Sequence, residues 1–140
     1  MQFICTSFFC KFGGIEFNKL STVPSLSDIK KVAQLIHGVV KRTPLEYSVP
    51  LSDRYGAQIF LKREDLQTVR SYKIRGAYFK ISNIPDALRP QGIVAASAGN
   101  HAQGVALACA KMKIHGNIFM PKSTPIQKLD AVRFFGQDYI

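Results

Sequence analysis

The last third of the chain, from residue 92 onward, alternates short apolar runs with segments whose apolar residues recur at helical spacing. The runs GIVAAS and GNIFMP have the nearly continuous apolar character of buried parallel strands. The expected elements are strands at 92–97 and 116–121, helices at 101–113 and 123–136, and a further strand that opens at 137–140. This alternation predicts an α/β fold, an open and incomplete parallel sheet with flanking helices.

The residues before 92 show the same alternation less regularly. An amphipathic helix is expected from about 27 to 40, a strand of the same sheet at 58–64, and a helix at 71–83 that ends before Pro85. Residues 1–26 show no clear period and are interpreted as a leader of unknown role ahead of one domain at 27–140. Parallel sheets place their chemistry beyond the carboxyl ends of the strands, which directs attention to the loops EDLQTVRSYK and SAGNHAQ.

The charge and the cysteine content of the chain limit the kinds of molecule that it could bind, without deciding among them. Lysine and arginine outnumber aspartate and glutamate by 19 to 9, a net charge of +10, which favours anionic partners such as nucleic acid, a membrane surface or a phosphorylated small molecule. No nucleic-acid-binding motif supports the first, and Lys11 interrupts the apolar N-terminus far short of a membrane span. Cys5, Cys10 and Cys109 form neither a disulfide framework nor a zinc pattern, so no metal and a cytoplasmic location are expected.

The segment SAGN lies between a predicted strand and a predicted helix. Backbone N–H groups at such a helix start lack intrahelical partners, and the helix dipole is positive there, so a carboxylate or phosphate would be stabilised. Ser97 adds a hydroxyl, Gly99 permits close approach or a positive φ, and Asn100 offers an amide. An ordinary helix N-cap explains the same residues equally well. Neither a Walker sequence nor a dinucleotide-binding glycine motif is present.

Lys73, within SYKIRGA, lies among other cations. If the side chains of Arg70 and Arg75 converge on it, their charge would lower its pKa and favour the neutral, nucleophilic amine. The alternative is a solvated basic helix face, which is the usual role of an isolated lysine. The second loop, with its anion-binding features, favours the chemical interpretation.

Taken together, EDLQTVRSYKIRGA and SAGNHAQG closely resemble the serine/threonine dehydratase family of pyridoxal-phosphate enzymes, which has the tryptophan-synthase β-like fold (fold type II). The segments RTPLEYSVPLSDRYGAQIFLKRED and PKSTPIQKLDAVRFFG are most similar to its biosynthetic threonine dehydratase branch. The resemblance runs from about residue 27 to residue 140. It implies the N-terminal portion of a longer catalytic domain, whose glycine-rich phosphate loop lies further along, so that these residues alone are expected to be inactive. The whole enzyme is expected to be a homo-oligomer.

The resemblance also implies roles for individual residues. Lys73 would bind pyridoxal phosphate covalently and remove the Cα proton of the substrate, and Tyr72 would lie against the cofactor ring. Asn100 would hydrogen-bond the 3′ oxygen of the cofactor. The substrate carboxylate would be held by the loop made of Ser97, Ala98, Gly99, Asn100 and His101. The implied reaction is β-elimination of L-threonine or L-serine to a 2-oxo acid and ammonia, in isoleucine biosynthesis.

Ala98 departs from a related group within this fold. Serine racemases carry a second serine there, on the opposite face of Cα, and without that hydroxyl elimination is favoured over racemisation. Two other readings stay open: a non-catalytic remnant or binding module of the same fold, and a nucleic-acid-binding module that depends on the charge alone.

Overall fold

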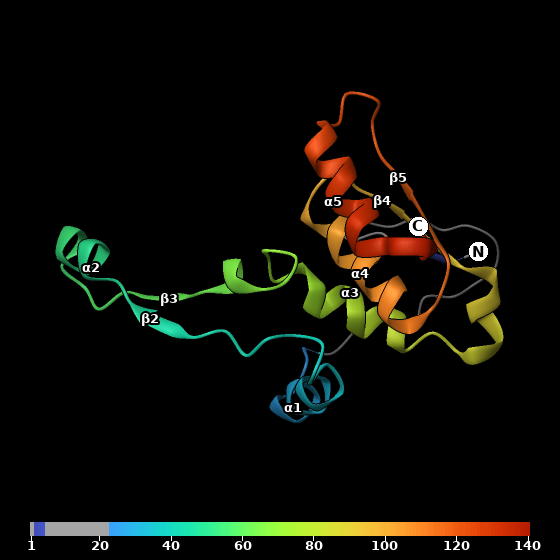
Figure 1. Cartoon of the computed structure of the whole chain (residues 1–140). Helices are drawn as coiled ribbons and strands as arrows, with labels where there is room; N and C mark the ends of the chain where they lie inside the picture. Colours follow the sequence, from blue (N-terminus) through green and yellow to red (C-terminus); the bar gives the residue numbers. More distant parts are fainter. Residues whose placement is uncertain (1, 5–22) are drawn as a thin grey trace.

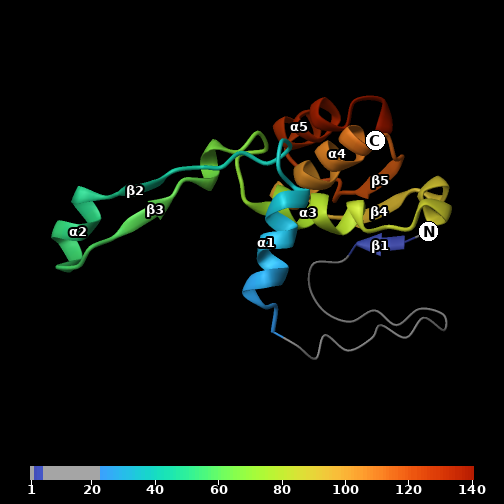
Figure 2. The same cartoon turned by 90° about the horizontal axis from the view of Figure 1, so that it is seen from below.

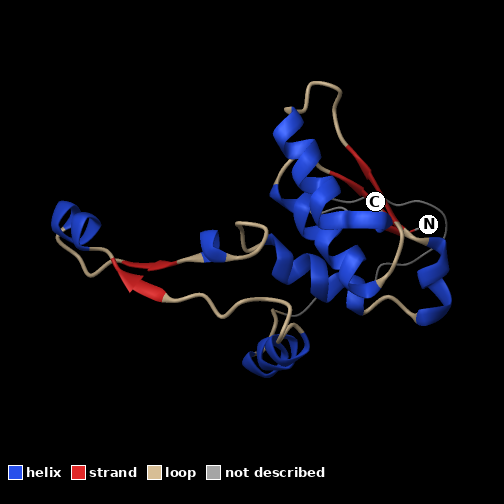
Figure 3. Ribbon diagram, viewed as in Figure 1, coloured by secondary structure: helices blue, strands red, loops and turns tan. Residues whose placement is uncertain are grey.

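Two small sheets organise the chain in a computed structural model that describes residues 2–4 and 23–140 (Figures 1 and 3). One sheet is parallel, in the order β1 (Gln2–Ile4), β4 (Ile93–Ala96) and β5 (Gly116–Phe119). In its register Ile93 lies opposite Gly116, and Ala96 lies opposite Phe119. The other sheet is an antiparallel pair, β2 (Leu45–Tyr47) and β3 (Phe60–Lys62).

Helices supply most of the remaining structure. The α-helices are α1 (Leu26–Leu35), α2 (Val49–Tyr55), α3 (Lys73–Ser82), α4 (Asn100–Met112) and α5 (Ile126–Gly136). Three short 3-10 helices are η1 (Glu64–Leu66), η2 (Asp86–Gln91) and η3 (Gln137–Tyr139). In α1, the Ser25 hydroxyl accepts from the Asp28 N–H and the Asp28 carboxylate accepts from the Ser25 N–H, a capping box that fixes where the helix begins.

The main core lies between the parallel sheet and the helices α3 and α4. Ile93 and Ala95 project from the same face of β4 because side chains alternate along a strand, and both are buried in this core. The members contributed by the helices are Ala77, Ile81, Val105, Ala108 and Cys109. α5 packs on α4 through Val132, beside Ala102 and Ala106. We call the parallel sheet with α3, α4 and α5 the body.

The residues 45–62, which we call the arm, extend away from the body (Figures 1 and 2). The helix α2 begins with Pro50 in its first turn, where a missing N–H costs nothing, and ends at Gly56 in the left-handed conformation (φ 61°). This reversal brings β3 back antiparallel to β2. The Ser52 hydroxyl then accepts a hydrogen bond from the Ile59 N–H at 3.0 Å, which closes the turn.

The structure confirms most of the predicted alternation and corrects it in four places. The strand expected at 58–64 is β3, and it pairs with β2 in the arm instead of joining the parallel sheet. The strand expected at 137–140 is η3, because Gln137 turns the chain (φ 50°) and folds Ile140 back toward Gly136. The first helix ends at Leu35 instead of continuing to residue 40. Within the leader, Gln2–Ile4 forms β1, whereas residues 5–22 lie outside the described residues.

The cysteines, the possible metal ligands and the lengths of the helices bear on the chemistries that the sequence disfavours. Cys109 is fully buried, and burial raises the pKa of its thiol to about 12, so it is an inert core residue; Cys5 and Cys10 lie outside the described residues. Among the residues that the structure describes, no group of His, Cys, Asp and Glu could hold a metal ion. The same residues include no helix long and apolar enough to cross a membrane.

Candidate active site

The loop between β4 and α4 is held by the edge of the sheet. The Ser97 N–H donates to the Phe119 carbonyl at 3.1 Å, which continues the pairing of β4 and β5 beyond their ends. The Ser97 hydroxyl accepts from the Gly99 N–H at 3.3 Å and so closes a tight turn. Gly99 is extended (φ −127°, ψ −153°), so the positive φ that a glycine permits is not used there. A Cβ at Gly99 would meet nothing within 4 Å, so its surface is open to a ligand.

The start of α4 has no side-chain cap. Gly99 is its N-cap, and within residues 23–140 no acceptor binds the backbone N–H groups of Asn100, His101 and Ala102. These N–H groups and the positive end of the helix dipole therefore face whatever occupies the loop. Asn100 is exposed at the first position of the helix. Gly99 is thus an N-cap in a turn, as the ordinary interpretation expects, and the free N–H groups of this helix start also suit an anion.

Lys73 begins α3 and is half-buried. Its N–H donates to the hydroxyl of buried Ser71 at 3.3 Å, and its Nζ lies 5.3 Å from the centroid of the Tyr72 ring. Tyr72 itself is 59% exposed, so one face of the ring remains available for stacking. Within the described part of the chain, the Lys73 amine makes no hydrogen bond or ion pair. It is a free amine next to an aromatic ring.

Gly104 explains how Lys73 comes to lie beside the loop. A Cβ at this position would lie 3.3 Å from the Lys73 carbonyl carbon and 3.3 Å from the Ile74 nitrogen, closer than ordinary van der Waals contact. The bare glycine therefore lets the first turn of α3 rest directly on α4. Since Gly104 is about one turn beyond Asn100, this contact puts Lys73 at the end of α4 where the free N–H groups lie.

The imidazole of His101 is buried in the first turn of α4, with 7% of the residue exposed. Its Nε2 has no hydrogen-bond partner among the described residues. Burial lowers the pKa of His101, and the charge of nearby Lys73 lowers it further, so the ring is neutral at neutral pH. A neutral, unpartnered nitrogen near the lysine is a group that a ligand can complete.

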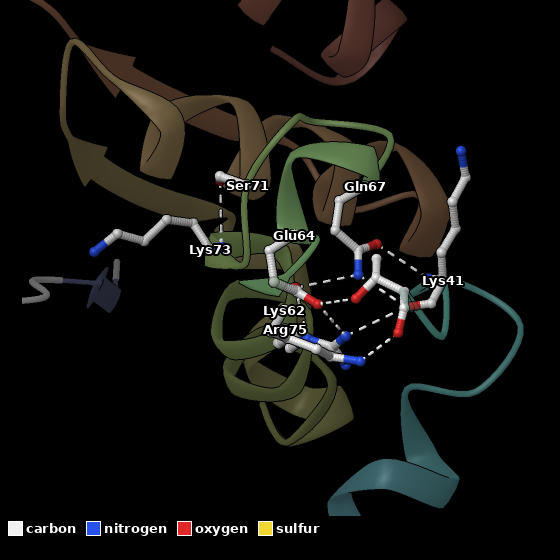
Figure 4. Close-up of polar contacts among 8 residues, drawn as sticks. Lys41, Lys62, Glu64, Gln67, Ser71, Lys73 and Arg75 are labelled. Carbon is white, nitrogen blue, oxygen red and sulfur yellow. Dashed lines mark hydrogen bonds and ion pairs between the residues drawn. The ribbon is translucent and has the colours of Figure 1, made fainter. Parts of the chain in front are cut away.

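The arginines do not surround Lys73 as expected. Arg75 turns to the opposite side of α3 and pairs with Glu64, with its Nη2 2.7 Å from Oε1, whereas Lys73 points away from that pair (Figure 4). Arg70 is exposed and adopts a left-handed backbone conformation (φ 55°) in the turn before Ser71. The hypothesis that both guanidinium groups converge on the amine is therefore wrong.

Sequence reasoning missed three residues that shape this site. Gly104 carries the helix contact, and Glu64 with Gln67 forms a polar network at the start of α3. The sequence did point to Gly104, because a glycine in the interior of a helix destabilises that helix by about 1 kcal/mol, and a packing contact is the usual reason for it. For Glu64 and Gln67, the only signal was an acidic pair in an otherwise basic segment.

The family is established by sequence. Residues 36–140 match the family of pyridoxal-phosphate dependent enzymes, and the chain belongs to it. The chain is similar to the biosynthetic L-threonine dehydratase IlvA of Halalkalibacterium halodurans, with 52% identity over 115 residues, covering 82% of this chain and 28% of that protein. The same enzyme of Bacillus subtilis is 48% identical over 122 residues, covering 87% and 29%. The chain thus spans less than a third of the length of these curated relatives.

Solved structures agree on the fold. The processed form of threonine deaminase isoform 2 from Solanum lycopersicum is similar with a TM-score of 0.70 and 40% identity, over 85% of this chain and 34% of that one. Maize serine racemase is similar with a TM-score of 0.74 and 34% identity, over 80% and 34%. The tryptophan-synthase β-like fold expected from the sequence is therefore confirmed.

Proposed function

We propose that this chain supplies the lysine and the carboxylate-binding loop of a pyridoxal-phosphate-dependent threonine dehydratase. The single observation that carries the proposal is the free amine of Lys73 beside the uncapped start of α4, across the contact at Gly104. The relatives named as threonine dehydratase or deaminase support the reaction class. By this proposal the activity belongs to the whole protein, of which these residues form one part.

The residues present fit pyridoxal phosphate. A lysine without a partner, an aromatic ring with an exposed face and an amide at Asn100 are groups that an aldehyde, a pyridine ring and a phenolic oxygen would use. The orphaned Nε2 of His101 gives a further polar group without a partner inside the protein. When bound, the cofactor would supply an electron-withdrawing ring that accepts the charge left at Cα.

Backbone and side-chain groups of this site have separate roles in the proposed reaction. Within the loop Ser97–His101, the free backbone N–H groups of Asn100 and His101 bind and orient the substrate carboxylate, with the helix dipole adding to the attraction. Lys73, once its amine is free, takes the Cα proton as general base. Tyr72 would limit rotation of the ring of pyridoxal phosphate by stacking on it. Loss of the β-hydroxyl gives a product that hydrolyses to a 2-oxo acid and ammonia.

Ala98 sets the balance between elimination and racemisation in this proposal. The similar structures include a threonine deaminase and the serine racemases from maize and Dictyostelium discoideum, which supports treating the two reactions as alternatives on this fold. Because alanine has no hydroxyl, no acid from position 98 can return a proton to the other face of Cα. In the whole enzyme, we expect L-threonine to give 2-oxobutanoate with little D-threonine, and Ala98→Ser to raise the D-isomer, which chiral chromatography would measure.

The lysine assignment is tested by covalent mapping. The chain is incubated with pyridoxal phosphate and reduced with borohydride, which fixes a lysine adduct as a stable secondary amine, and the labelled peptides are identified by mass spectrometry. We expect Lys73 to carry more label than Lys80, an exposed lysine at the far end of the same helix. Lys73→Ala should remove that excess, whereas Lys80→Ala should leave it. Equal labelling of both lysines in the unaltered chain would contradict the proposal.

Further proposals concern the metabolic pathway, the cellular location and the oligomeric state of the whole enzyme. We propose a role in isoleucine biosynthesis, which the relatives' description as biosynthetic threonine dehydratases supports, and a cytoplasmic location, which the cysteine pattern supports. A homo-oligomeric whole enzyme is proposed from the family resemblance alone. A binding module of the same fold is the competing function, supported by the open apolar surface of the arm and the charge of +10. Formation of 2-oxobutanoate by the whole protein, abolished by Lys73→Ala, decides between the two.

A further inference from the structure

Glu64 is the centre of a polar network at the start of α3. Its carboxylate receives the Arg75 guanidinium in a two-point contact, with Nε 2.9 Å from Oε2 and Nη2 2.7 Å from Oε1. The Thr43 hydroxyl donates to Oε1 at 2.5 Å and the Gln67 amide donates to Oε2 at 3.2 Å. The Arg75 hydrogen bonds hold the pKa of Glu64 at about 2 against the opposing effect of burial. The carboxylate is therefore ionised and has a donor on both oxygens.

The same network reaches the backbone of a distant segment. The side-chain amide of Gln67 accepts from the Lys41 N–H at 3.0 Å and donates to the Lys41 carbonyl at 2.8 Å, as a second strand would. Arg75 Nη2 lies 3.3 Å from the same carbonyl, and the Lys62 ammonium donates to the Thr43 carbonyl. Figure 4 shows these groups gathered on one side of α3. We call Lys41, Thr43, Glu64, Gln67 and Arg75 the clamp.

The clamp fixes the helix that carries Lys73. Arg75 is two residues after Lys73 in the first turn of α3, and at about 100° per residue the two side chains leave the helix in nearly opposite directions. Arg75 held by Glu64 therefore sets the rotation of this turn. Lys73 points away from the clamp (Figure 4), and within the described residues no partner holds its amine. Its direction thus depends on the helix backbone, which the clamp holds on one side and Gly104 of α4 contacts on the other.

We infer that Glu64 is a positioning residue: acting through Arg75, it fixes the first turn of α3 so that Lys73 is aimed at the start of α4. This inference rests on the proposed function, since the direction of Lys73 matters only if its amine reacts. It assigns a role to a residue that would touch neither cofactor nor substrate. A charge-assisted two-point contact suits this role, because it specifies both distance and angle.

The test uses the labelling experiment on the unaltered chain and on Glu64→Gln. Glutamine keeps the size of the side chain and one acceptor oxygen, but it loses the charge and one of the two bonds to Arg75. We expect the ratio of label on Lys73 to label on Lys80 to fall roughly tenfold, since displacement of a reacting group by 1 Å can cost about 100-fold in rate. Glu64→Asp, which keeps the charge, should recover part of the ratio.

The matched control is Asp65→Asn. It removes the same charge one residue away, from an exposed carboxylate whose partner is Arg63 at 2.8 Å, and it should leave the labelling ratio unchanged. A purely stabilising role for Glu64 would lower the melting temperature without moving the ratio measured well below it. Circular dichroism of each variant checks that α3 and the rest of the fold are retained.

The outcomes separate this inference from the proposed function. If Lys73 is not preferred over Lys80 in the unaltered chain, the proposed function fails. If Lys73 is preferred and the ratio stays the same in Glu64→Gln, the positioning role is refuted. Arg75→Lys provides the second variant, because lysine keeps the charge but cannot bond both oxygens, and an unchanged ratio there has the same meaning. Loss of folding in both variants would also overturn the inference, since the clamp would then be a requirement for folding.

Discussion

The body and the arm are built on different principles. In α4 of the body, eight residues are buried, among them His101, Gly104, Val105 and Cys109. In the arm, every residue of β2 and β3 is exposed, and Ser52 is the one buried residue of α2. Apolar side chains such as Leu45 (63% exposed) and Phe60 (51%) therefore contribute little hydrophobic stabilisation to the arm. The body depends on a shared core, and the arm on contacts with its own sequence neighbours.

The contacts within the arm are local. The rings of Tyr47 and Phe60 meet edge to face with centroids 5.4 Å apart, and Arg63 pairs with Glu46 at 2.5 Å. An isolated two-stranded hairpin is marginally stable at best in water, so these contacts alone give it little independent stability. The clamp lies where the chain enters and leaves the arm, and it also holds the lysine helix. Lys73, the lysine that we propose to react, is therefore carried by a helix at the junction of a part with a shared core and a part with few buried side chains.

The largest expected effect comes from truncating one apolar side chain in each region. Ile81→Ala in the body removes a side chain that is fully buried and should lower the free energy of unfolding by about 3 kcal/mol. Phe60→Ala in the arm removes a larger side chain that is 51% exposed and should cost about 1 kcal/mol or less. Urea denaturation followed by circular dichroism gives both values. Equal losses would break the distinction between body and arm, because they would show that the arm shares the stability of the core.

A second prediction concerns the contact of α3 with α4. Gly104→Val places a branched side chain against the backbone of Lys73 and Ile74, which cannot move without displacing α3, and should destabilise the body by about 2 kcal/mol. Gly76→Ala is the matched control in α3, since a Cβ there meets nothing within 4 Å. It should stabilise the helix by up to about 1 kcal/mol through helix propensity. Thermal unfolding checks both signs, and a neutral Gly104→Val would remove the packing account of how Lys73 is placed.

The clamp predicts a pH dependence of stability. The pKa of Glu64 is lowered from 4.5 to about 2, so its stabilisation is fully present above pH 4.5 and is lost as the pH falls toward 2. We expect the ionised Glu64 to contribute about 1–2 kcal/mol to the free energy of unfolding. This is less than its pKa shift alone implies, because water screens the charge of the partly exposed Arg75. Glu64→Gln should lack this slope, which unfolding curves recorded at several pH values would show.

His101 contributes to stability over a different pH range from Glu64. The two contributions can therefore be distinguished in the same unfolding curves. Its pKa is lowered from 6.5, so its stabilisation is complete above that value and declines as the pH falls below it. The variant Glu64→Gln should retain this upper part of the curve. If instead both windows disappeared in that variant, the clamp would be coupled to the loop of α4 more directly than the geometry indicates.

The comparison also explains what the sequence could and could not predict. Most of the body follows from apolar runs and helical spacing in adjacent stretches, as at β4 and α4, but β1 lies in the stretch that is expected to be a leader. The arm does not follow from such patterns. The run at 58–64 looks like a buried strand, yet Phe60 and Leu61 are exposed, because the position of Gly56 in a left-handed turn makes the chain return beside β2. A local apolar pattern does not state which strand is the partner.

In the candidate active site too, the residues can be predicted from the sequence but their arrangement cannot. Lys73 and the loop Ser97–His101 were identified as candidates from local patterns and from the resemblance, but their arrangement depends on contacts between distant residues. Arg75 illustrates this, because proximity in sequence suggested that it would act on Lys73, whereas a glutamate eleven positions away draws it to the other side of the helix. Pairing across such separations is a property of the packed fold and not of a segment.

The smallest expected effect compares two left-handed residues, one in each region. Arg70 (φ 55°) lies next to the clamp, and Gly56 (φ 61°) lies in the arm. The left-handed conformation is about 1–2 kcal/mol unfavourable for an L-residue, so Arg70→Gly relieves this strain, but glycine also loses more entropy on folding. We expect the free energy of unfolding to rise by about 0.5 kcal/mol. Gly56→Ala introduces the same backbone strain, although the new Cβ has open space around it, and should lower the stability of the arm by about 1 kcal/mol.

Amide hydrogen exchange tests whether the arm opens independently. If it does, Gly56→Ala will speed exchange in β2 and β3 and leave the global unfolding midpoint unchanged, whereas Arg70→Gly will move that midpoint. A shift of the global midpoint by Gly56→Ala would show that the arm unfolds together with the body.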